Sequence, residues 1–382
     1  MSKRLVLITL LFVYMLASCA PLTGTPPAPV TESVTLAPGT DTPATDTAAP
    51  PFIEPIPVHV GYGGRGSWFE IYFTDPTNAV SKQESGGIEE AVIASIDAAR
   101  LSVDAAFYSL SLREIANALL RARDRGVQVR IVMESDNRDG SVPQALIDAG
   151  LPILGDRRQG LMHDKFIVID RSEVWTGSMN YTTNGVYDDN NNLIHLRSVK
   201  IAENYETEFN EMYVNDLFGP DVLAATPNPH VTVDGMDVET YFSPDDGVAN
   251  HILELVNGAQ SSIYFLAYSF TSDDIGQAMR DRATAGVTVT GVMESDQVAS
   301  NQGTEFDPFR QAGLDVRLDG NSGLMHHKVI IIDRSIVIAG SYNFTASAEN
   351  QNDENVVIFF SPFIAEWYMA EFERVFGVAK LP

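Results

Sequence analysis

The sequence predicts an α/β fold in which one α/β sandwich unit occurs twice in tandem. Residues 87–136 align with residues 247–296 at an offset of 160 positions. Residues 161–182 align with residues 324–345 at an offset of 163, and both segments carry the same pattern of polar residues. Within each copy, apolar segments suited to strands alternate with amphipathic segments suited to helices, which is typical of a mostly parallel or mixed sheet covered by helices.

The helices are predicted from apolar residues at helical spacing. Four apolar residues mark the first helix of the first copy: Ile88, Val92, Ile96 and Ala99. Three more mark the second helix, which Gly126 ends: Ile115, Leu119 and Leu120. Each set places its apolar side chains on one helical face, so we expect both helices to pack against the sheet.

The strands are predicted from short apolar runs and from alternation. Residues 103–108 and 263–268 are equivalent runs suited to a buried strand, and residues 127–133 alternate between apolar and polar side chains. Residues 166–169 and 329–332 are apolar runs in the later part of each copy. Each copy is therefore expected to run helix, strand, helix, strand, strand.

The N-terminal segment predicts export. Residues 1–18 contain a basic start and an apolar run too short for a comfortable membrane span, as in a secretory signal. The string L-A-S-C ending at Cys19 resembles a bacterial lipobox, which implies cleavage before Cys19 and lipid attachment to it. A plain signal peptide cleaved near Ala20 is the alternative.

The remaining boundaries follow from composition. Residues 19–57 are rich in Pro, Thr and Ala and poor in apolar side chains, so we expect a disordered tether. The first repeat is predicted over 58–220 and the second over 231–382, joined by the Pro-containing stretch 219–230. We expect the protein to be exported and anchored by lipid to the cell envelope, or secreted if Cys19 is not lipidated.

The charge is strongly acidic. The chain has 25 Lys and Arg residues against 51 Asp and Glu residues, a formal net charge of −26. This balance weighs against broad binding to nucleic acid, where neutralisation of phosphates supplies most of the affinity. It does not exclude a local basic cleft, because net charge says little about one site.

The pattern H-x-K-x4-D occurs once in each copy and carries the chemistry. It comprises His163, Lys165 and Asp170 in the first copy, and His326, Lys328 and Asp333 in the second. Each triad is followed by G-S-x-N, and these tails supply four more candidates: Ser178, Asn180, Ser341 and Asn343. We expect the two aspartates to support the site, and the two serines either to touch a phosphate or to close a turn.

Two such motifs, brought face to face, suit a phosphodiester. Side chains two residues apart on a strand share a face, so each copy presents an imidazole beside an ammonium group. One imidazole would attack phosphorus and the other would transfer protons, both with pKa values of about 6.5 in isolation. The lysines, with Asn180 and Asn343, would stabilise the charge on the phosphoryl oxygens. A metal site is less consistent with the pattern, because the lysines repel a cation and no third ligand is evident.

Residues 28 positions after each histidine predict how the imidazoles are oriented. Glu354 follows His326 at that distance, and Asn191 follows His163. If each orients the histidine of its own copy, the carboxylate favours a protonated His326 and the amide leaves His163 neutral. The sequence then predicts His163 as nucleophile and His326 as acid and base. Asp188 and Asp189 remain alternatives to Asn191 as the orienting residue.

Across about residues 60–378 the chain resembles the phospholipase D superfamily, whose signature is the paired HKD motif. The resemblance implies two repeats sharing one site on a pseudo-twofold axis, a phosphohistidine intermediate and no metal or other cofactor. Many members of the superfamily carry an acidic residue where this chain has Asn191.

The resemblance implies a phosphodiesterase, and three functions follow as hypotheses. The first is hydrolysis of the distal phosphodiester of phospholipids at a membrane surface to give phosphatidic acid, with transfer of the phosphatidyl group to alcohols as an additional reaction. The second is an extracytoplasmic, metal-independent nuclease, with Arg157 and Arg158 adding to a basic cleft. The third is a surface protein that binds without catalysis. With both copies in one chain we expect a monomer that needs no protein partner.

The string Met-Glu-Ser-Asp also occurs twice, at 133–136 and 293–296. We expect it to end a strand and begin a solvated turn.

Overall fold

The structure is a computed structural model that describes residues 53–158 and 160–381. The predicted signal segment, Cys19 and most of the predicted tether therefore lie outside the described residues. Within the described part of the chain, no helix is long and apolar enough to cross a bilayer.

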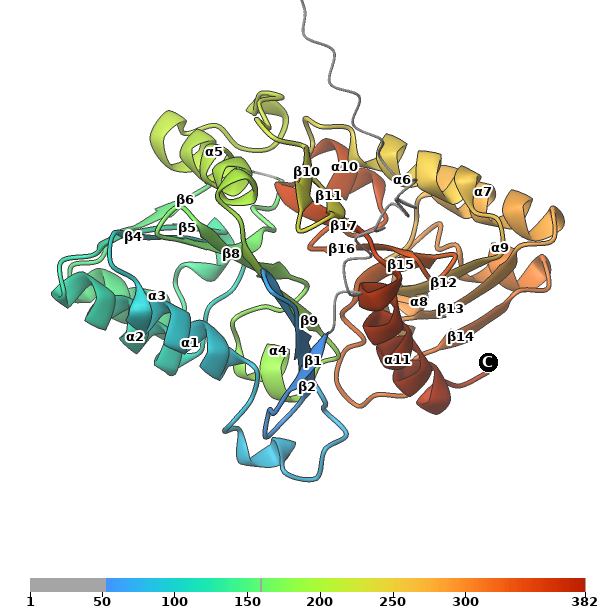
Figure 1. Ribbon diagram of the computed structural model, residues 1–382, viewed down its shortest axis with the longest axis horizontal. Coiled ribbons are helices and arrows are strands. Elements are labelled where there is room, and N and C mark those ends of the chain that lie inside the picture. Colours follow the sequence, from blue (N-terminus) through green and yellow to red (C-terminus); the bar gives the residue numbers. More distant parts are fainter. Residues whose placement is uncertain (1–52, 159, 382) are drawn as a thin grey trace, which may run out of the picture. The chain divides into compact units, whose positions relative to one another are not determined.

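The first half forms a mixed nine-stranded sheet in the order β1-β2-β3-β9-β8-β7-β4-β5-β6 (Figure 1). Its strands are β1 (Glu54–Ile56), β2 (Tyr62–Arg65), β3 (Phe69–Phe73), β4 (Ser102–Phe107), β5 (Gln128–Met133), β6 (Ile153–Gly155), β7 (Lys165–Ile169), β8 (Glu173–Gly177) and β9 (Asn192–Arg197). Its α-helices are α1 (Glu89–Ala98), α2 (Arg113–Asp124), α3 (Ser141–Asp148), α4 (Thr183–Tyr187) and α5 (Val199–Asn215). Strands β4, β5 and β6 pair in parallel, and the other pairings are antiparallel.

The second half repeats this order in an eight-stranded sheet, β10-β11-β17-β16-β15-β12-β13-β14. Its strands are β10 (His230–Val233), β11 (Met236–Ser243), β12 (Ser262–Ala267), β13 (Thr288–Met293), β14 (Asp315–Leu318), β15 (Lys328–Ile332), β16 (Ile336–Gly340) and β17 (Glu354–Phe360). Its α-helices are α6 (Val248–Gly258), α7 (Asp273–Thr284), α8 (Ser295–Ser300), α9 (Phe306–Gln311), α10 (Ala346–Asn350) and α11 (Pro362–Val378). The α/β fold with two repeats is therefore confirmed, including the predicted helix, strand, helix, strand order.

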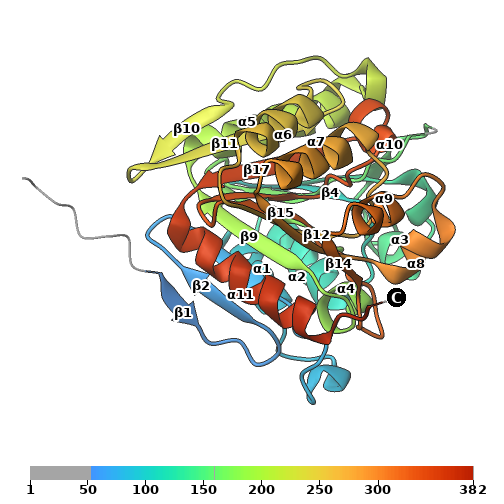
Figure 2. The same ribbon diagram turned by 90° about the vertical axis from the view of Figure 1, so that its right-hand side faces the viewer.

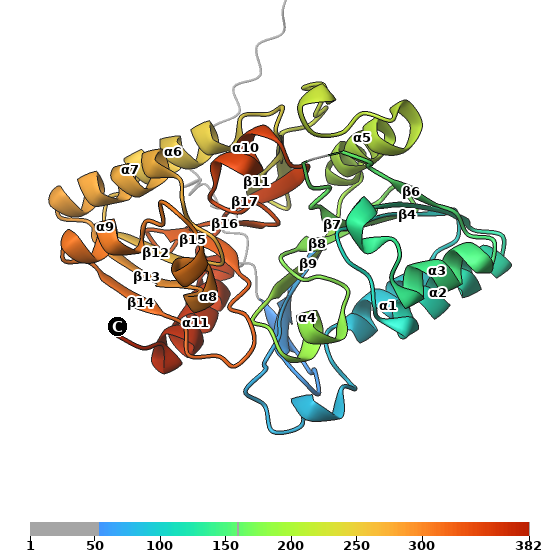
Figure 3. The same ribbon diagram turned by 180° about the vertical axis from the view of Figure 1, so that it is seen from behind.

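Three apolar clusters stabilise these layers. One joins α1, α2 and α3 to the first sheet, and a second joins α6, α7 and α9 to the second sheet. The third contains residues from the other faces of both sheets together with α5 and α11. Figures 2 and 3 show α5 and α11 on the sheet faces opposite to the α1–α3 and α6–α7 layers. The two repeats thus share one apolar core.

The predicted end of the tether at residue 57 is wrong. Strand β1 lies inside that range and pairs antiparallel with β2. Ile53 and Ile56 pack against the apolar clusters, which gives this segment buried contacts that its Pro-rich composition did not suggest. The stretch 219–230 does separate α5 from β10, although it includes a short 3₁₀ turn at Gly219–Asp221.

Candidate active site

The two histidine–lysine pairs lie at equivalent places in the two sheets. Lys165 begins β7 and Lys328 begins β15, and each histidine lies two residues earlier. Both strands are internal to their sheets, between β8 and β4 and between β16 and β12. His163 and His326 are each 5% exposed, so both imidazoles are nearly removed from solvent.

The backbone beside each histidine pairs with the other repeat. His163 N–H donates to the Asp353 carbonyl at 3.0 Å, and His326 N–H donates to the Asn190 carbonyl at 2.9 Å. Isolated bridges Met162–Asp353 and Asn190–Met325 complete these two contacts. The histidines therefore meet at the junction of the repeats, related by a pseudo-twofold arrangement of equivalent residues.

Two glycines allow this close approach. A Cβ at Gly160 would lie 2.2 Å from the Gln351 carbonyl oxygen, and one at Gly323 would lie 2.0 Å from the Asp188 carbonyl oxygen. Both contacts are far inside van der Waals distance, and both come from the opposite repeat. The glycines three residues before each histidine are therefore needed because another backbone passes there.

The orienting residues are exchanged between the repeats, which contradicts the prediction. Glu354 does not orient His326: its Oε2 lies 2.7 Å from Nδ1 of His163. Asn191 does not orient His163: its Oδ1 lies 2.9 Å from Nδ1 of His326. The cause is the cross-repeat backbone pairing, since Glu354 follows Asp353 and Asn191 follows Asn190.

This exchange changes what each imidazole can do. Asn191 Nδ2 donates to the Gly185 carbonyl at 2.8 Å, which leaves Oδ1 as the atom facing His326. An amide oxygen only accepts, so neutral His326 carries its proton on Nδ1 and keeps a lone pair on Nε2. His163 faces a carboxyl group, which stabilises an imidazolium. With the partners exchanged, the same reasoning predicts His326 as nucleophile and His163 as acid and base.

The tail serines hold the orienting residues. Ser178 Oγ donates to Asn191 Oδ1 at 2.8 Å and accepts from Asn192 N–H. Ser341 Oγ accepts from Asn355 N–H at 3.0 Å, and its hydrogen bond to Glu354 favours the ionised carboxylate and so opposes the rise of that residue's pKa. Both serines thus position the orienting residues, and their predicted contact with a phosphate stays a prediction.

The tail asparagines are half-buried and offer free acceptor atoms. Oδ1 of Asn180 and Oδ1 of Asn343 are both buried and have no hydrogen-bond partner among the described residues. Neither side chain contacts a histidine or lysine of the motif through a hydrogen bond within the described chain. Their predicted contact with phosphoryl oxygens stays a prediction.

Each lysine is held against the backbone of its histidine and against a tyrosine. Lys165 Nζ donates to the His163 carbonyl, and Lys328 Nζ donates to the His326 carbonyl at 2.8 Å. The ammonium groups lie 4.8 Å and 4.6 Å from the ring centres of Tyr108 and Tyr268. These contacts fix the lysines beside the imidazoles.

The two tyrosines are site residues that the sequence interpretation missed. The Tyr108 ring centre lies 4.7 Å from that of His163, and the Tyr268 ring centre lies 4.6 Å from that of His326, both edge-to-face. The signal was present, because Tyr-Ser occurs at the same place in both copies, directly after the strands β4 and β12. Each tyrosine therefore forms one wall of its half-site.

Burial disfavours charge throughout the site. Desolvation first, and then Lys165 and Lys328, lower the pKa of both histidines well below the usual value. Burial lowers the pKa of Lys165 to about 7, and burial and then Lys165 lower the pKa of Lys328 well below its usual value. Burial raises the pKa of Glu354 to about 7. A phosphodiester anion would reverse these trends, because it favours the protonated forms of the four cation-forming groups.

The glutamates of the repeated Met-Glu-Ser-Asp string are buried, so the expected solvated turn is wrong at these positions. Glu134 and Glu294 are each 2% exposed. Their Oε2 atoms accept the N–H groups of Met162 and Met325, the residues directly before the catalytic candidates. The string therefore fixes the backbone that leads into each histidine.

The motif aspartates lie at the far ends of β7 and β15. Asp170 accepts the backbone N–H groups of residues 100–102, and Asp333 accepts those of residues 260–262. Both have positive φ of 51°. They join each motif strand to the start of its neighbour and make no contact with the imidazoles.

The remaining candidates are occupied elsewhere. Asp189 accepts the Leu324 N–H and Asp188 pairs with Lys82, so neither orients a histidine. Arg157 and Arg158 pair with Asp216 and Asp221, and the suggested basic cleft is neutralised at these positions.

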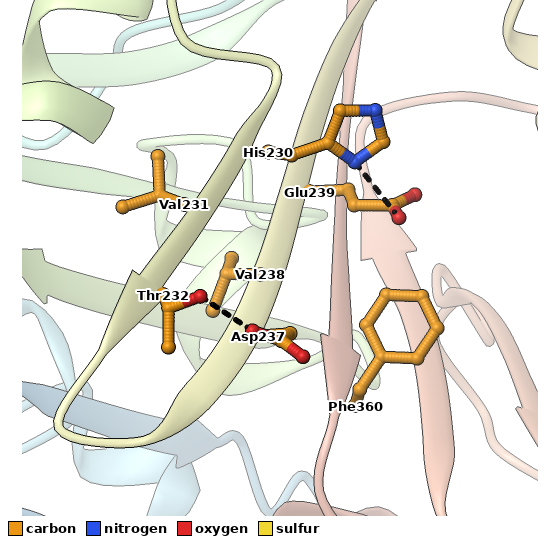
Figure 4. Close-up of a pocket in the computed structure, with 7 residues that line it drawn as sticks. All are labelled: His230, Val231, Thr232, Asp237, Val238, Glu239 and Phe360. Atoms are coloured by element: carbon orange, nitrogen blue, oxygen red, sulfur yellow. Dashed lines mark hydrogen bonds and ion pairs between the residues drawn. The ribbon is translucent and has the colours of Figure 1, made fainter.

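A hollow of about 340 Å³ lies away from this site, beside the β10–β11 hairpin and Phe360 (Figure 4). Its polar groups satisfy one another: His230 pairs with Glu239 at 3.0 Å, and Thr232 donates to Asp237 at 2.6 Å. Among the described residues, no group of His, Cys, Asp and Glu side chains is arranged to hold a metal ion.

Comparison with known proteins gives the same family in both halves. Residues 92–213 and 252–376 match the family described as "Cardiolipin synthase, PLD-like domain". A phospholipase D of Rickettsia bellii is 31% identical over 163 residues, which cover 41% of this chain and 81% of that protein. A mitochondrial cardiolipin hydrolase of Chlamydomonas reinhardtii is 29% identical over 181 residues, with the same two coverages.

A solved structure extends the likeness to both repeats at once. Phosphatidylserine synthase of Haemophilus influenzae Rd KW20 superposes with a TM-score of 0.60 over 82% of this chain and 87% of that chain. The sequence identity is 13%, so the likeness shows a common fold.

Proposed function

Because the chain belongs to the PLD-like domain family and is a phosphodiesterase of the phospholipase D type, we propose that it hydrolyses the distal phosphodiester of phospholipids to phosphatidic acid. One observation carries the proposal. Each buried imidazole is oriented by a residue of the opposite repeat, so both histidines belong to one site.

The reaction would proceed through a phosphohistidine. Nε2 of His326 attacks phosphorus, and the bond from phosphorus to the headgroup oxygen breaks. Imidazolium His163 donates its proton to that oxygen, then takes one from the water that cleaves the phosphohistidine. An alcohol in place of water gives transfer of the phosphatidyl group.

The cationic side chains would stabilise the charge on phosphorus-bound oxygens. Lys165 and Lys328 supply ammonium groups, and the amides of Asn180 and Asn343 can donate N–H groups.

Charge favours a lipid substrate over a nucleic acid. The net charge is −26, and the two arginines that could have widened a basic cleft are paired with aspartates. A lipid phosphodiester presents one charge to the site, whereas a nucleic acid needs a longer basic track.

The test is a panel of phosphodiesters assayed in EDTA. Vesicles of phosphatidylcholine and of phosphatidylglycerol are compared with single- and double-stranded DNA, using His163→Ala and His326→Ala as inactive controls. We expect headgroup release from vesicles that both substitutions abolish. DNA cleavage without headgroup release would support the nuclease alternative, and no turnover of any diester would leave only a binding protein.

We also propose that the protein is anchored outside the cytoplasm through lipid on Cys19. The support is the L-A-S-C string and the Pro- and Thr-rich segment that follows. Incorporation of an alkyne-labelled fatty acid into the wild type, and its loss in Cys19→Ser, is the expected result. Equal labelling of both proteins would contradict the proposal.

A further inference from the structure

The segment that positions His326 is itself held by a side chain of the last helix. The Asn190 carbonyl accepts the His326 N–H at 2.9 Å, and Asn191 Oδ1 lies 2.9 Å from Nδ1 of the same imidazole. These two consecutive residues of the first repeat therefore contact both the backbone and the ring of the histidine that acts as nucleophile in the proposed mechanism. Whatever holds residues 190–191 in place then bears on the reaction.

Arg374 on α11 makes the contact that holds this segment. Its Nη2 donates to Asn190 Oδ1 at 2.6 Å and to the Thr74 carbonyl at 3.4 Å. Because Asn190 is only 2% exposed, its side chain has little solvent to bond with, and the guanidinium is the partner of its amide oxygen. One side chain thus connects α11 of the second repeat to the segment before β9 of the first.

The guanidinium is fixed by a buried carboxylate on the same helix. Arg374 donates to both oxygens of Glu371 at 2.7 Å, through Nε and Nη2. Glu371 is fully buried, accepts from Tyr62 Oη at 2.6 Å and pairs with Nε2 of His327 at 2.7 Å. Two parallel bonds to one carboxylate fix the plane of a guanidinium, so Arg374 presents Nη2 to Asn190 in one orientation.

The first histidine is held by the equivalent segment, but that segment has a different support. Asp353 stands 163 residues after Asn190, and its carbonyl accepts the His163 N–H at 3.0 Å. Its Oδ1 accepts the Gly219 N–H at 2.5 Å, so the backbone of the chain between the repeats holds it. A side chain of α11 thus supports the segment beside one histidine, whereas a backbone group supports the segment beside the other.

Glu211 on α5 occupies the position equivalent to Arg374, 163 residues earlier. Its Oε2 accepts the Leu223 N–H at 3.2 Å, and within the described chain no hydrogen bond joins its side chain to Asp353 or to Asn190. The two helices α5 and α11 therefore differ in what they hold. Glu211 offers a matched control, because it is a buried charged residue at the same helical position that supports neither segment.

We propose that Arg374 is a positioning residue for His326 and acts through Asn190. By holding the Asn190 side chain, the guanidinium keeps the Asn190 carbonyl on the His326 backbone and the adjacent Asn191 amide on Nδ1 of the ring. Nδ1 then keeps its proton, and the lone pair of Nε2 stays directed at phosphorus. The effect on the reaction rests on the proposed phosphodiesterase function, whereas the effect on the imidazole does not.

The first test is the rate of the first turnover with a p-nitrophenyl phosphodiester. Release of p-nitrophenolate needs attack by His326 but no proton, so the burst reports the attack alone. We expect Arg374→Gln to lower the burst rate constant by roughly tenfold or more, because a displaced nucleophile reacts slowly. The half-saturating substrate concentration should not change, since the substrate contacts remain.

Two further variants show whether the effect passes through Asn190. Asn190→Ala leaves the ion pair of Arg374 with Glu371 intact and should lower the burst rate constant as Arg374→Gln does, whereas Glu211→Gln should match the wild type. The double variant of Arg374→Gln and Asn190→Ala should be no slower than the slower single variant, because both changes break one contact. A wild-type burst in Asn190→Ala, or losses that multiply in the double variant, would overturn the inference.

The second test observes the imidazole itself and needs no turnover. Proteins labelled with ¹⁵N in histidine are compared by NMR, and the His326 signals are those missing from His326→Ala. We expect the Nδ1–H tautomer in the wild type and in Glu211→Gln. Arg374→Gln and Asn190→Ala should show a mixture with the Nε2–H tautomer, because Nδ1 loses its fixed acceptor.

The wild-type tautomer in both of these variants would overturn the positioning role. A wild type that cleaves no phosphodiester would end the proposed function, but the tautomers would still decide whether Arg374 positions His326.

Discussion

His163 and His326 occupy equivalent positions in the two repeats, yet their surroundings differ in chemistry. A carboxyl group faces Nδ1 of His163, whereas an amide oxygen faces Nδ1 of His326. The residue after His163 is the buried Asp164, whereas the residue after His326 is His327, which pairs with the buried Glu371. A duplicated scaffold thus supplies two matched imidazoles, and substitutions between the copies give them different hydrogen-bond partners.

The largest expected effect is a difference in kcat between the two histidine variants on a substrate whose leaving group needs no proton. With a p-nitrophenyl phosphodiester, His326→Ala should lower kcat by about 10⁴-fold or more, because the nucleophile is lost. His163→Ala should cost roughly 10²-fold or less, since p-nitrophenolate leaves without a proton. Steady-state kinetics measure both values. The reverse order would assign nucleophilic attack to His163.

The next effect concerns the exchanged orienting residues. Glu354→Gln should lower kcat on a phospholipid by about 10²-fold, because His163 loses the carboxyl group that supports its imidazolium. Asn191→Asp, which makes the two sides alike, should cost roughly tenfold by making His326 more basic. Both variants need circular dichroism melts as controls. An unchanged kcat in Glu354→Gln would contradict a catalytic role for the contact between Glu354 and His163 at 2.7 Å.

A smaller effect should appear in the pH dependence of substrate capture. The pKa of Lys165 is lowered to about 7 by burial, so in the free enzyme its charge is present below that pH and lost above it. We therefore expect kcat/KM for an anionic diester to fall as pH rises through about 7. In Lys165→Arg, whose charge persists, this fall should weaken. A limb at the same pH and of the same size in both proteins would exclude Lys165 as its source.

The smallest effect concerns the buried glutamates before each motif. Glu134→Gln and Glu294→Gln each weaken the hold on one histidine backbone and should cost about 1–2 kcal/mol of unfolding free energy. Urea unfolding measures this loss, and kcat should change less than tenfold. A loss confined to one variant would show that the backbone segments leading into the two histidines are not equivalent.

The duplication made most of the fold predictable. Aligned apolar runs predicted β4, β12, β7 and β15, and helical spacing predicted α1 and α2, because burial against a sheet requires those periods. Strand β1 was not predicted because it lies at the end of a Pro-rich segment, and its three residues are ordered only by pairing with β2.

The catalytic candidates could also be predicted from the sequence, but the hydrogen-bond partners of the two imidazoles could not. The H-x-K spacing placed His163 beside Lys165 because strand geometry fixes such neighbours. The partner of each imidazole depends on how two repeats cross, which no local pattern encodes. The separation of 28 residues therefore suggested a pairing within each repeat, whereas Glu354 and Asn191 reach across the junction. The surroundings of Asp164 and His327 could not be predicted either, because they depend on how helices α5 and α11 pack on the sheets.

The most direct test of the central claim is to identify the phosphorylated residue. Wild-type protein is mixed with a phospholipid, quenched within its first turnover under conditions that preserve phosphohistidine, and digested for mass spectrometry. We expect a phosphatidyl or phosphoryl adduct on His326 and none on His163. An adduct on His163 would contradict the assignment that follows from the exchanged partners, and steady turnover without an adduct on either histidine would contradict the covalent mechanism.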